Sequence, residues 1–67
     1  MERDWVRIFE SPDEMKVEIA RQLLEEHQID AAIINKRDRV YLIGDVELYV
    51  NRGMVIKAKS VIKDLLI

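Results

Sequence analysis

The sequence predicts a small α+β domain built from three strands and two helices. Apolar residues recur at helical spacing in two segments, near residues 12–27 and 52–66, which indicates two amphipathic helices. Residues 46–50 instead alternate between apolar and polar side chains, which is typical of a strand with one buried face. Two short apolar segments, residues 4–10 and 30–35, complete the order strand, helix, strand, strand, helix.

The N-terminal part is expected to form a strand followed by a helix. Residues 4–10 carry apolar side chains on both faces of the predicted strand. Ser11 is expected to cap the helix, with Pro12 at its first position and Glu14 reaching back to the cap. The helix should then run from about residue 12 to about residue 27. Its predicted core-facing residues are Met15, Ile19, Ala20, Leu23 and Leu24.

The remaining elements follow from the same patterns. Residues 30–35 form the predicted second strand, apolar on both faces, and residues 40–50 form a third strand with a bulge at Gly44. Asn51 is expected to cap the second helix, which extends over about residues 52–66. The predicted buried residues of the third strand are Val46, Leu48 and Val50, and those of the second helix are Val55, Ala58, Ile62 and Leu65.

The rules for connections between strands predict a sheet topology from this order of elements. A right-handed crossover makes the first two strands parallel, and a hairpin makes the third antiparallel to the second. With the third strand in the middle, the sheet order is 1-3-2 and both helices lie on one face. The prediction is a single domain over residues 1–67, a ferredoxin-like split β-α-β unit that lacks the last strand (β-α-β-β-α). Residues 65–67 are a possible substitute for that strand.

Composition restricts the ways in which the domain can be stabilised. A chain of 67 residues buries only about 60% of its unfolded surface, so disulfides, a metal or self-association commonly assist such domains. The chain has no cysteine and a single histidine, His27, which leaves self-association. The net charge of -2 disfavours nucleic-acid binding. The apolar runs are too short to span a membrane and no secretory signal is visible, so we expect a cytoplasmic protein without a membrane partner.

No residue pattern indicates catalysis, a cofactor or a metal. Ser11 is explained as a helix cap, Ser60 falls within the second helix, and His27 lies where an imidazolium would interact favourably with the end of the first helix. The polar turn at residues 36–39 is interpreted as solvated surface. The glycines, Gly44 and Gly53, lack the spacing of a phosphate-binding loop. We therefore expect a non-enzymatic protein without a cofactor.

The face of the sheet away from the helices is the candidate interaction surface. The predicted register pairs Arg7 with Glu47, Trp5 with Tyr49, and Phe9 with Asp45. It brings matching charges and aromatic rings together where no helix covers them, and uncovered apolar patches commonly mark interaction sites. The candidate residues are Trp5, Arg7, Phe9, Glu47 and Tyr49. The first and second strands are both edges, which also allows strand addition.

Four segments carry a family resemblance: residues 5–10 (WVRIFE), 23–29 (LLEEHQI), 31–35 (AAIIN) and 44–50 (GDVELYV). Through them the chain resembles a bacterial family of small domains of unknown function, described as prokaryotic signal-transducing proteins. The resemblance implies a ferredoxin-like fold distantly similar to nitrogen-regulatory signalling proteins, and it supplies no ligand, substrate or functional residue. The family pattern has glycine after the first helix, where this chain has Gln28.

The leading hypothesis is a regulatory or interaction domain that works by self-association or by protein binding, through the open sheet face or a sheet edge. An alternative, suggested by the resemblance, is a small-molecule sensor with a pocket between subunits. Single-stranded RNA binding is a third hypothesis, because RNA-recognition sheets display aromatic residues on neighbouring strands. The acidic net charge disfavours it, since phosphate neutralisation supplies much of nucleic-acid affinity.

Overall fold

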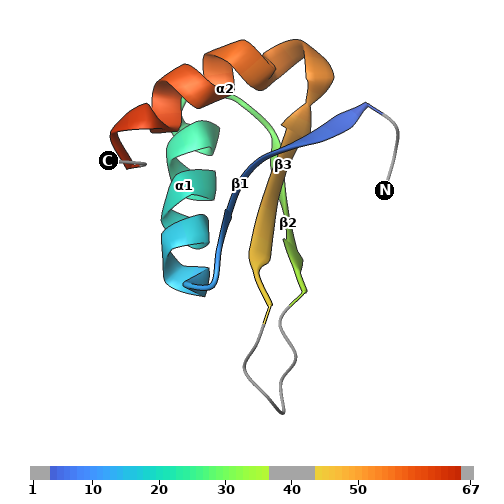
Figure 1. The fold of residues 1–67 in the computed structure, drawn as a ribbon. Coiled ribbons are helices and arrows are strands. Elements are labelled where there is room, and N and C mark those ends of the chain that lie inside the picture. The colour runs from blue at the N-terminus through green and yellow to red at the C-terminus, as the bar shows by residue number, and fades with distance from the viewer. Residues whose placement is uncertain (1–3, 37–43, 66–67) are drawn as a thin grey trace.

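A computed structural model describes residues 4–36 and 44–65. The elements follow in the order β1 (Trp5–Ser11), α1 (Glu14–Glu26), β2 (Ala31–Asn35), β3 (Val46–Asn51) and α2 (Val55–Ile62). Short 3-10 helices, η1 (Arg52–Met54) and η2 (Lys63–Leu65), flank α2. The strands form one sheet in the order β1-β3-β2, with β3 antiparallel to both neighbours (Figure 1). The predicted α+β fold with its 1-3-2 sheet is confirmed.

The core lies between one face of the sheet and the two helices. Val46, Leu48 and Val50 of the central strand are fully buried, as their alternation predicted. The helices bury Val17, Ala20 and Leu24 from α1 and Ala58 and Ile62 from α2 against the same strand face. Both helices therefore cover one side of the sheet and leave its other side open (Figure 1).

The buried side of α1 matches the prediction only in part, because Ala20 and Leu24 are buried as expected but two other predicted core residues are not. Met15 and Ile19, expected in the core, are 71% and 47% exposed, whereas Val17 is fully buried. Each helical residue turns the chain by about 100°, so Val17 points away from both. The helix thus has apolar side chains on two sides, and the side that packs against the sheet is that of Val17, Ala20 and Leu24. Periodicity alone does not distinguish these two sides.

The start of α1 also differs from the prediction. The N-cap is Asp13, whose Oδ1 accepts a hydrogen bond from the Met15 backbone N–H at 3.1 Å. Ser11 belongs to β1, and its Oγ accepts from the Asp13 backbone N–H at 3.1 Å. The prediction of Ser11 as the cap was wrong by two residues. Ser11 instead fixes the turn that presents Asp13 to the helix.

A left-handed residue ends α1. Gln28 has a φ of 63°, and its N–H donates to the Glu25 carbonyl at 2.9 Å. The following N–H, from Ile29, donates to the Leu24 carbonyl at 3.0 Å, which completes a Schellman motif. Ile29 and Leu24 are both buried and supply the apolar contact typical of this motif. The helix therefore stops where the sequence indicated, although glutamine replaces the favoured glycine.

The C-terminal helix is less regular than predicted. Asn51 caps the start of this segment, the 3-10 helix η1, because its Oδ1 accepts from the Gly53 N–H at 3.0 Å; α2 begins after Met54 without a side-chain cap. The residues that follow form η1, α2 and η2 rather than one continuous α-helix. Leu65 ends η2 and packs against the core, so it does not begin a replacement strand. Residues 66 and 67, and residues 40–43 of the predicted third strand, lie outside the described residues. Gly44 has a φ of 105° and precedes β3, which begins only at Val46.

The positive φ at position 28 predicts that glycine at this position stabilises the folded protein. Gln28→Gly should raise the free energy of unfolding by about 1 kcal/mol, because a side chain in the left-handed region is strained. The matched control is Gln22→Gly, at an exposed site inside α1, which should lower it by about 0.5–1 kcal/mol. Urea denaturation measures both. Equal destabilisation by the two variants would contradict the assigned helix end.

Candidate interaction surface

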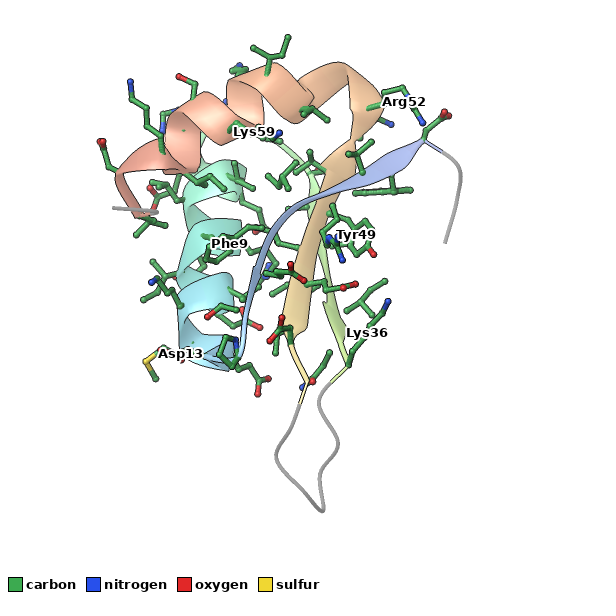
Figure 2. All side chains as sticks on the ribbon, viewed as in Figure 1. Phe9, Asp13, Lys36, Tyr49, Arg52 and Lys59 are labelled. Carbon is green, nitrogen blue, oxygen red and sulfur yellow. The ribbon has the colours of Figure 1, made fainter. Side chains whose placement is uncertain are left out.

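A β-bulge at Ile8 determines which β1 side chains reach the open side of the sheet. Arg7 pairs with Tyr49, and the next pair joins Phe9 to Leu48, so Ile8 is an extra residue. The extra residue reverses the alternation, and both Ile8 and Phe9 pack against the core. Figure 2 shows Phe9 on the α1 side of the sheet. The placement of Phe9 on the open face was therefore wrong.

The predicted register was also wrong, by two residues. Arg7 lies opposite Tyr49 rather than Glu47, and Trp5 lies opposite Asn51. A shift of two residues keeps each side chain on its predicted face, because the side-chain period of a strand is two. Trp5, Arg7, Glu47 and Tyr49 therefore still share one face, as predicted.

The open face is defined here by side chains from all three strands and by the residue that follows β2. Its members are Trp5, Arg7, Glu10, Ala32, Ile34, Lys36, Glu47 and Tyr49. Figure 2 shows Tyr49 and Lys36 on the side of the sheet away from α1. Ala32 and Ile34 belong to this face because they pair with Tyr49 and Glu47, respectively.

The carboxylate of Glu47 is the centre of the open face. Its Oε2 accepts from Arg7 Nη1 at 2.9 Å, and its Oε1 accepts from the Tyr49 hydroxyl at 2.9 Å. Lys36 Nζ lies 3.2 Å from the same Oε1. Only 6% of the Glu47 side chain is exposed, although no helix covers this face. The side chains around it therefore shield the carboxylate and satisfy it at the same time.

Arg7 offsets the repulsion between two carboxylates that the register places opposite each other. Glu10 pairs directly with Glu47, and like charges opposite each other in a sheet are destabilising. Arg7 Nη1 is 3.5 Å from the Glu10 carboxylate and 2.9 Å from that of Glu47, so one guanidinium serves both. Substituting Arg7 would leave two carboxylates facing each other across the strands.

Hydrogen bonding shifts the pKa values of Glu47, Tyr49 and Arg7 in this cluster. Bonds from the Tyr49 hydroxyl and from Arg7, supported by Lys36, lower the pKa of Glu47 because they stabilise its ionised form. The same contact with Glu47 raises the pKa of Tyr49. The pKa of Arg7 is raised as well, mainly through its hydrogen bond to Glu47. At neutral pH Glu47 is therefore ionised, the Tyr49 phenol is neutral and Arg7 is a cation.

The cations present donors to solvent while Glu47 holds them in place. The side chains of Arg7 and Lys36 are 51% and 58% exposed. Within the described residues, both ionic contacts of Arg7 use Nη1. The N–H groups of Nε and Nη2 can therefore donate to an oxygen on another molecule, with the guanidinium already oriented.

The structure also locates the residues considered for chemistry. His27 is the exposed C-cap residue of α1, Ser11 is engaged in the turn before that helix, and Ser60 is exposed on α2. Among the described residues, no group of three or more histidine, aspartate or glutamate side chains is arranged to hold a metal ion. In the part of the chain that the structure describes, the ion pairs between different strand regions are those around Glu47.

Sequence reasoning missed Lys36 and Glu10 as members of the open face. Lys36 was assigned to a solvated turn, but it continues the alternation of Ala32 and Ile34 beyond the end of β2. That alternation was enough to place Lys36 on the open face from the sequence. Glu10 could not be placed, because the bulge at Ile8 carries no glycine or proline to mark it.

Comparisons with known proteins do not assign this chain to a family. No protein-family model matches the chain, and no curated protein or solved structure matches it significantly. The resemblance to prokaryotic signal-transducing domains stays a prediction. Among the described residues, no helix is long and apolar enough to cross a membrane.

The lowered pKa of Glu47 predicts how stability depends on pH. Glu47→Gln should lower Tm by more than about 5 °C at pH 7, because Arg7 and Lys36 lose their shared carboxylate. A carboxyl whose pKa falls on folding stabilises the protein above its unfolded pKa of about 4.3. The difference in Tm should therefore shrink as the pH drops below that value and Glu47 becomes protonated.

The matched control is Asp30→Asn, an exposed residue after α1 that lies outside the open face, which should change Tm little at pH 7. Thermal melts followed by circular dichroism from pH 7 to acid provide the comparison. A Glu47 variant that behaves like the Asp30 variant, or a Tm difference that persists in acid, would contradict the role given to Glu47.

Proposed function

We propose that the chain is a non-enzymatic interaction domain that binds another protein through the open face of its sheet. The observation that carries the proposal is the grouping of Trp5, Arg7 and Tyr49 around a buried carboxylate on the uncovered face. Tryptophan, tyrosine and arginine are the residue types most enriched among those that dominate binding energy in protein interfaces.

Preorganisation supports the same proposal. Free arginine side chains lose conformational entropy when they bind, but the contacts with Glu47 and Glu10 already restrict Arg7. Tyr49 is likewise held by its bond to Glu47. A partner therefore meets a surface whose main donors and rings need little ordering.

The exposed groups suggest the chemistry of the partner. The remaining Arg7 donors fit a carboxylate or a backbone carbonyl, and the half-buried Trp5 offers an apolar surface on the same strand. Two copies of this chain fit the face less well. The exposed acid that a second copy would offer, Glu10, already contacts Arg7 within the chain, so pairing would only exchange one arginine–glutamate contact for another. We favour a different protein with an acidic group beside an apolar side chain.

The other hypotheses receive less support from this site. A carboxylate at the centre of the face does not favour the phosphate backbone of a single-stranded RNA. Ser60 lies on α2, His27 is the C-cap residue of α1, and the Oγ of Ser11 at the end of β1 accepts from the Asp13 N–H, which gives no support to a catalytic serine. A cytoplasmic location stays an expectation from the sequence.

Affinity capture from cells of the source organism tests the proposal, with quantitative mass spectrometry of proteins retained by immobilised baits. The face variants are Trp5→Ala and Arg7→Gln, and the control is Lys57→Ala, an exposed residue of α2 on the helix side. A partner should be retained by the wild type and the control and lost from both face variants. With the purified partner, each face variant should raise Kd by more than about tenfold.

Circular dichroism must show that every bait is folded at the capture temperature. Folded face variants that retain the same proteins in the same amounts as the wild type, with unchanged Kd, would overturn the proposal. Binding of an RNA pool that Arg7→Gln abolishes would also overturn it.

A further inference from the structure

The outer side of the helices carries the exposed large apolar residues of the described chain. These are Met15 and Ile19 on α1 and Ile56 on α2, at 71%, 47% and 88% exposure. Met15 and Ile19 are one helical turn apart, on the side of α1 away from its buried residues. Ile56 stands two positions before the buried Ala58, so it points away from the core as well.

Helix α1 and the segment from η1 to η2 have net charges of opposite sign. Helix α1 has acidic residues at Glu14, Glu18, Glu25 and Glu26 and basic residues at Lys16 and Arg21. The segment from η1 to η2 has the reverse balance, with basic residues at Arg52, Lys57, Lys59 and Lys63 and an acidic residue at Asp64. An acidic helix with exposed apolar residues thus lies beside a basic helical segment with an exposed isoleucine.

Charged residues also follow the exposed apolar ones along each outer side. Glu26 lies seven positions after Ile19, and Lys59 and Lys63 lie three and seven positions after Ile56. Within the described part of the chain, the ion pairs on α1 join Arg21 to Glu18 and to Glu25. Glu26, Lys59 and Lys63 take part in no ion pair among these residues and are available to an opposite charge.

We infer that the outer side of α1 docks onto the outer side of α2 in a second copy of this chain. Met15 and Ile19 pack against Ile56 of the second copy, while Glu26 meets its Lys59 and Lys63. The surface that complements an acidic helix with apolar residues is a basic helix with an apolar residue, and α2 has that character. Within one chain the two outer sides face away from the sheet and cannot meet.

A two-fold axis satisfies both contacts at once, since each copy offers one α1 side and one α2 side. Closed two-fold dimers are the commonest homo-oligomers. A standard interface takes about 800 Å² from each partner, roughly a sixth of the 4960 Å² exposed by this chain. The contact uses the helix side only, so it leaves the open face of the sheet available for the proposed protein partner.

Paired charge substitutions test this inference by sedimentation equilibrium. Wild type should have about twice the monomer mass of 7.9 kDa, with weaker association in high salt. Ile19→Arg places a positive charge opposite the basic side of α2, and Ile56→Glu places a negative charge opposite the acidic side of α1. Each variant alone should raise the dimer Kd by more than about tenfold.

Mixing the two variants provides the rescue. In a heterodimer, Arg at position 19 of one chain meets Glu at position 56 of the other, and the second contact has wild-type residues on both sides. An equimolar mixture of Ile19→Arg and Ile56→Glu should therefore restore the dimer. Both sites are exposed, so the variants should fold, and circular dichroism confirms this before the masses are compared.

The open-face variants Trp5→Ala and Arg7→Gln are the matched controls and should remain dimeric. A wild type that stays monomeric up to about millimolar concentration, the weak end of measurable affinity, would overturn the inference. Loss of the dimer in Trp5→Ala, with dimers retained in both helix variants, would place self-association on the open face and overturn it too. So would a mixture of helix variants that remains monomeric beside a dimeric wild type.

Discussion

The side chain of Glu47 joins contacts from all three strand regions in one carboxylate. Arg7 reaches it from β1, Tyr49 from β3 and Lys36 from the end of β2. Its neighbours in sequence, Val46 and Leu48, point the other way and are fully buried beneath the helices. The side chains of the central strand are therefore shielded on both faces of the sheet. The hydrophobic core shields one face, and the charged cluster shields the other. In so small a domain, this cluster replaces the second layer that would otherwise shield the sheet.

The two sides of the molecule differ in how they can bind. On the open face the charges are paired within the chain and the donors are preorganised, which suits recognition of a separate protein. On the helix side, exposed apolar residues accompany charges that form no ion pair within the described part of the chain, a combination that suits contact between copies. Self-association through the helices and partner binding through the sheet are thus compatible in one assembly, because the two contacts use different residues.

Sequence patterns were sufficient for the fold and insufficient for the register. The alternation from Val46 to Val50 identified the central strand and its buried face, and the order of elements implied the 1-3-2 sheet. The bulge at Ile8 follows from pairing with a distant strand, and no local residue marks it, so Phe9 and Glu10 were not placed correctly. Helix α1 carries apolar residues on two sides, and only the packing against the sheet shows that Val17 rather than Met15 is buried. Trp5, Arg7, Glu47 and Tyr49 were found because a register shift of two preserves their face.

Side-chain carboxyl NMR of Glu47 as a function of pH tests the central claim most directly, because it follows this one group in the folded protein. If Arg7, Tyr49 and Lys36 donate to it as described, Glu47 will titrate at a lower pH than an exposed glutamate of the same chain, and Tyr49→Phe will raise its pKa. If Glu47 titrates near the ordinary glutamate value of about 4.3, unaffected by Tyr49→Phe, the carboxylate does not organise the open face and the account is contradicted.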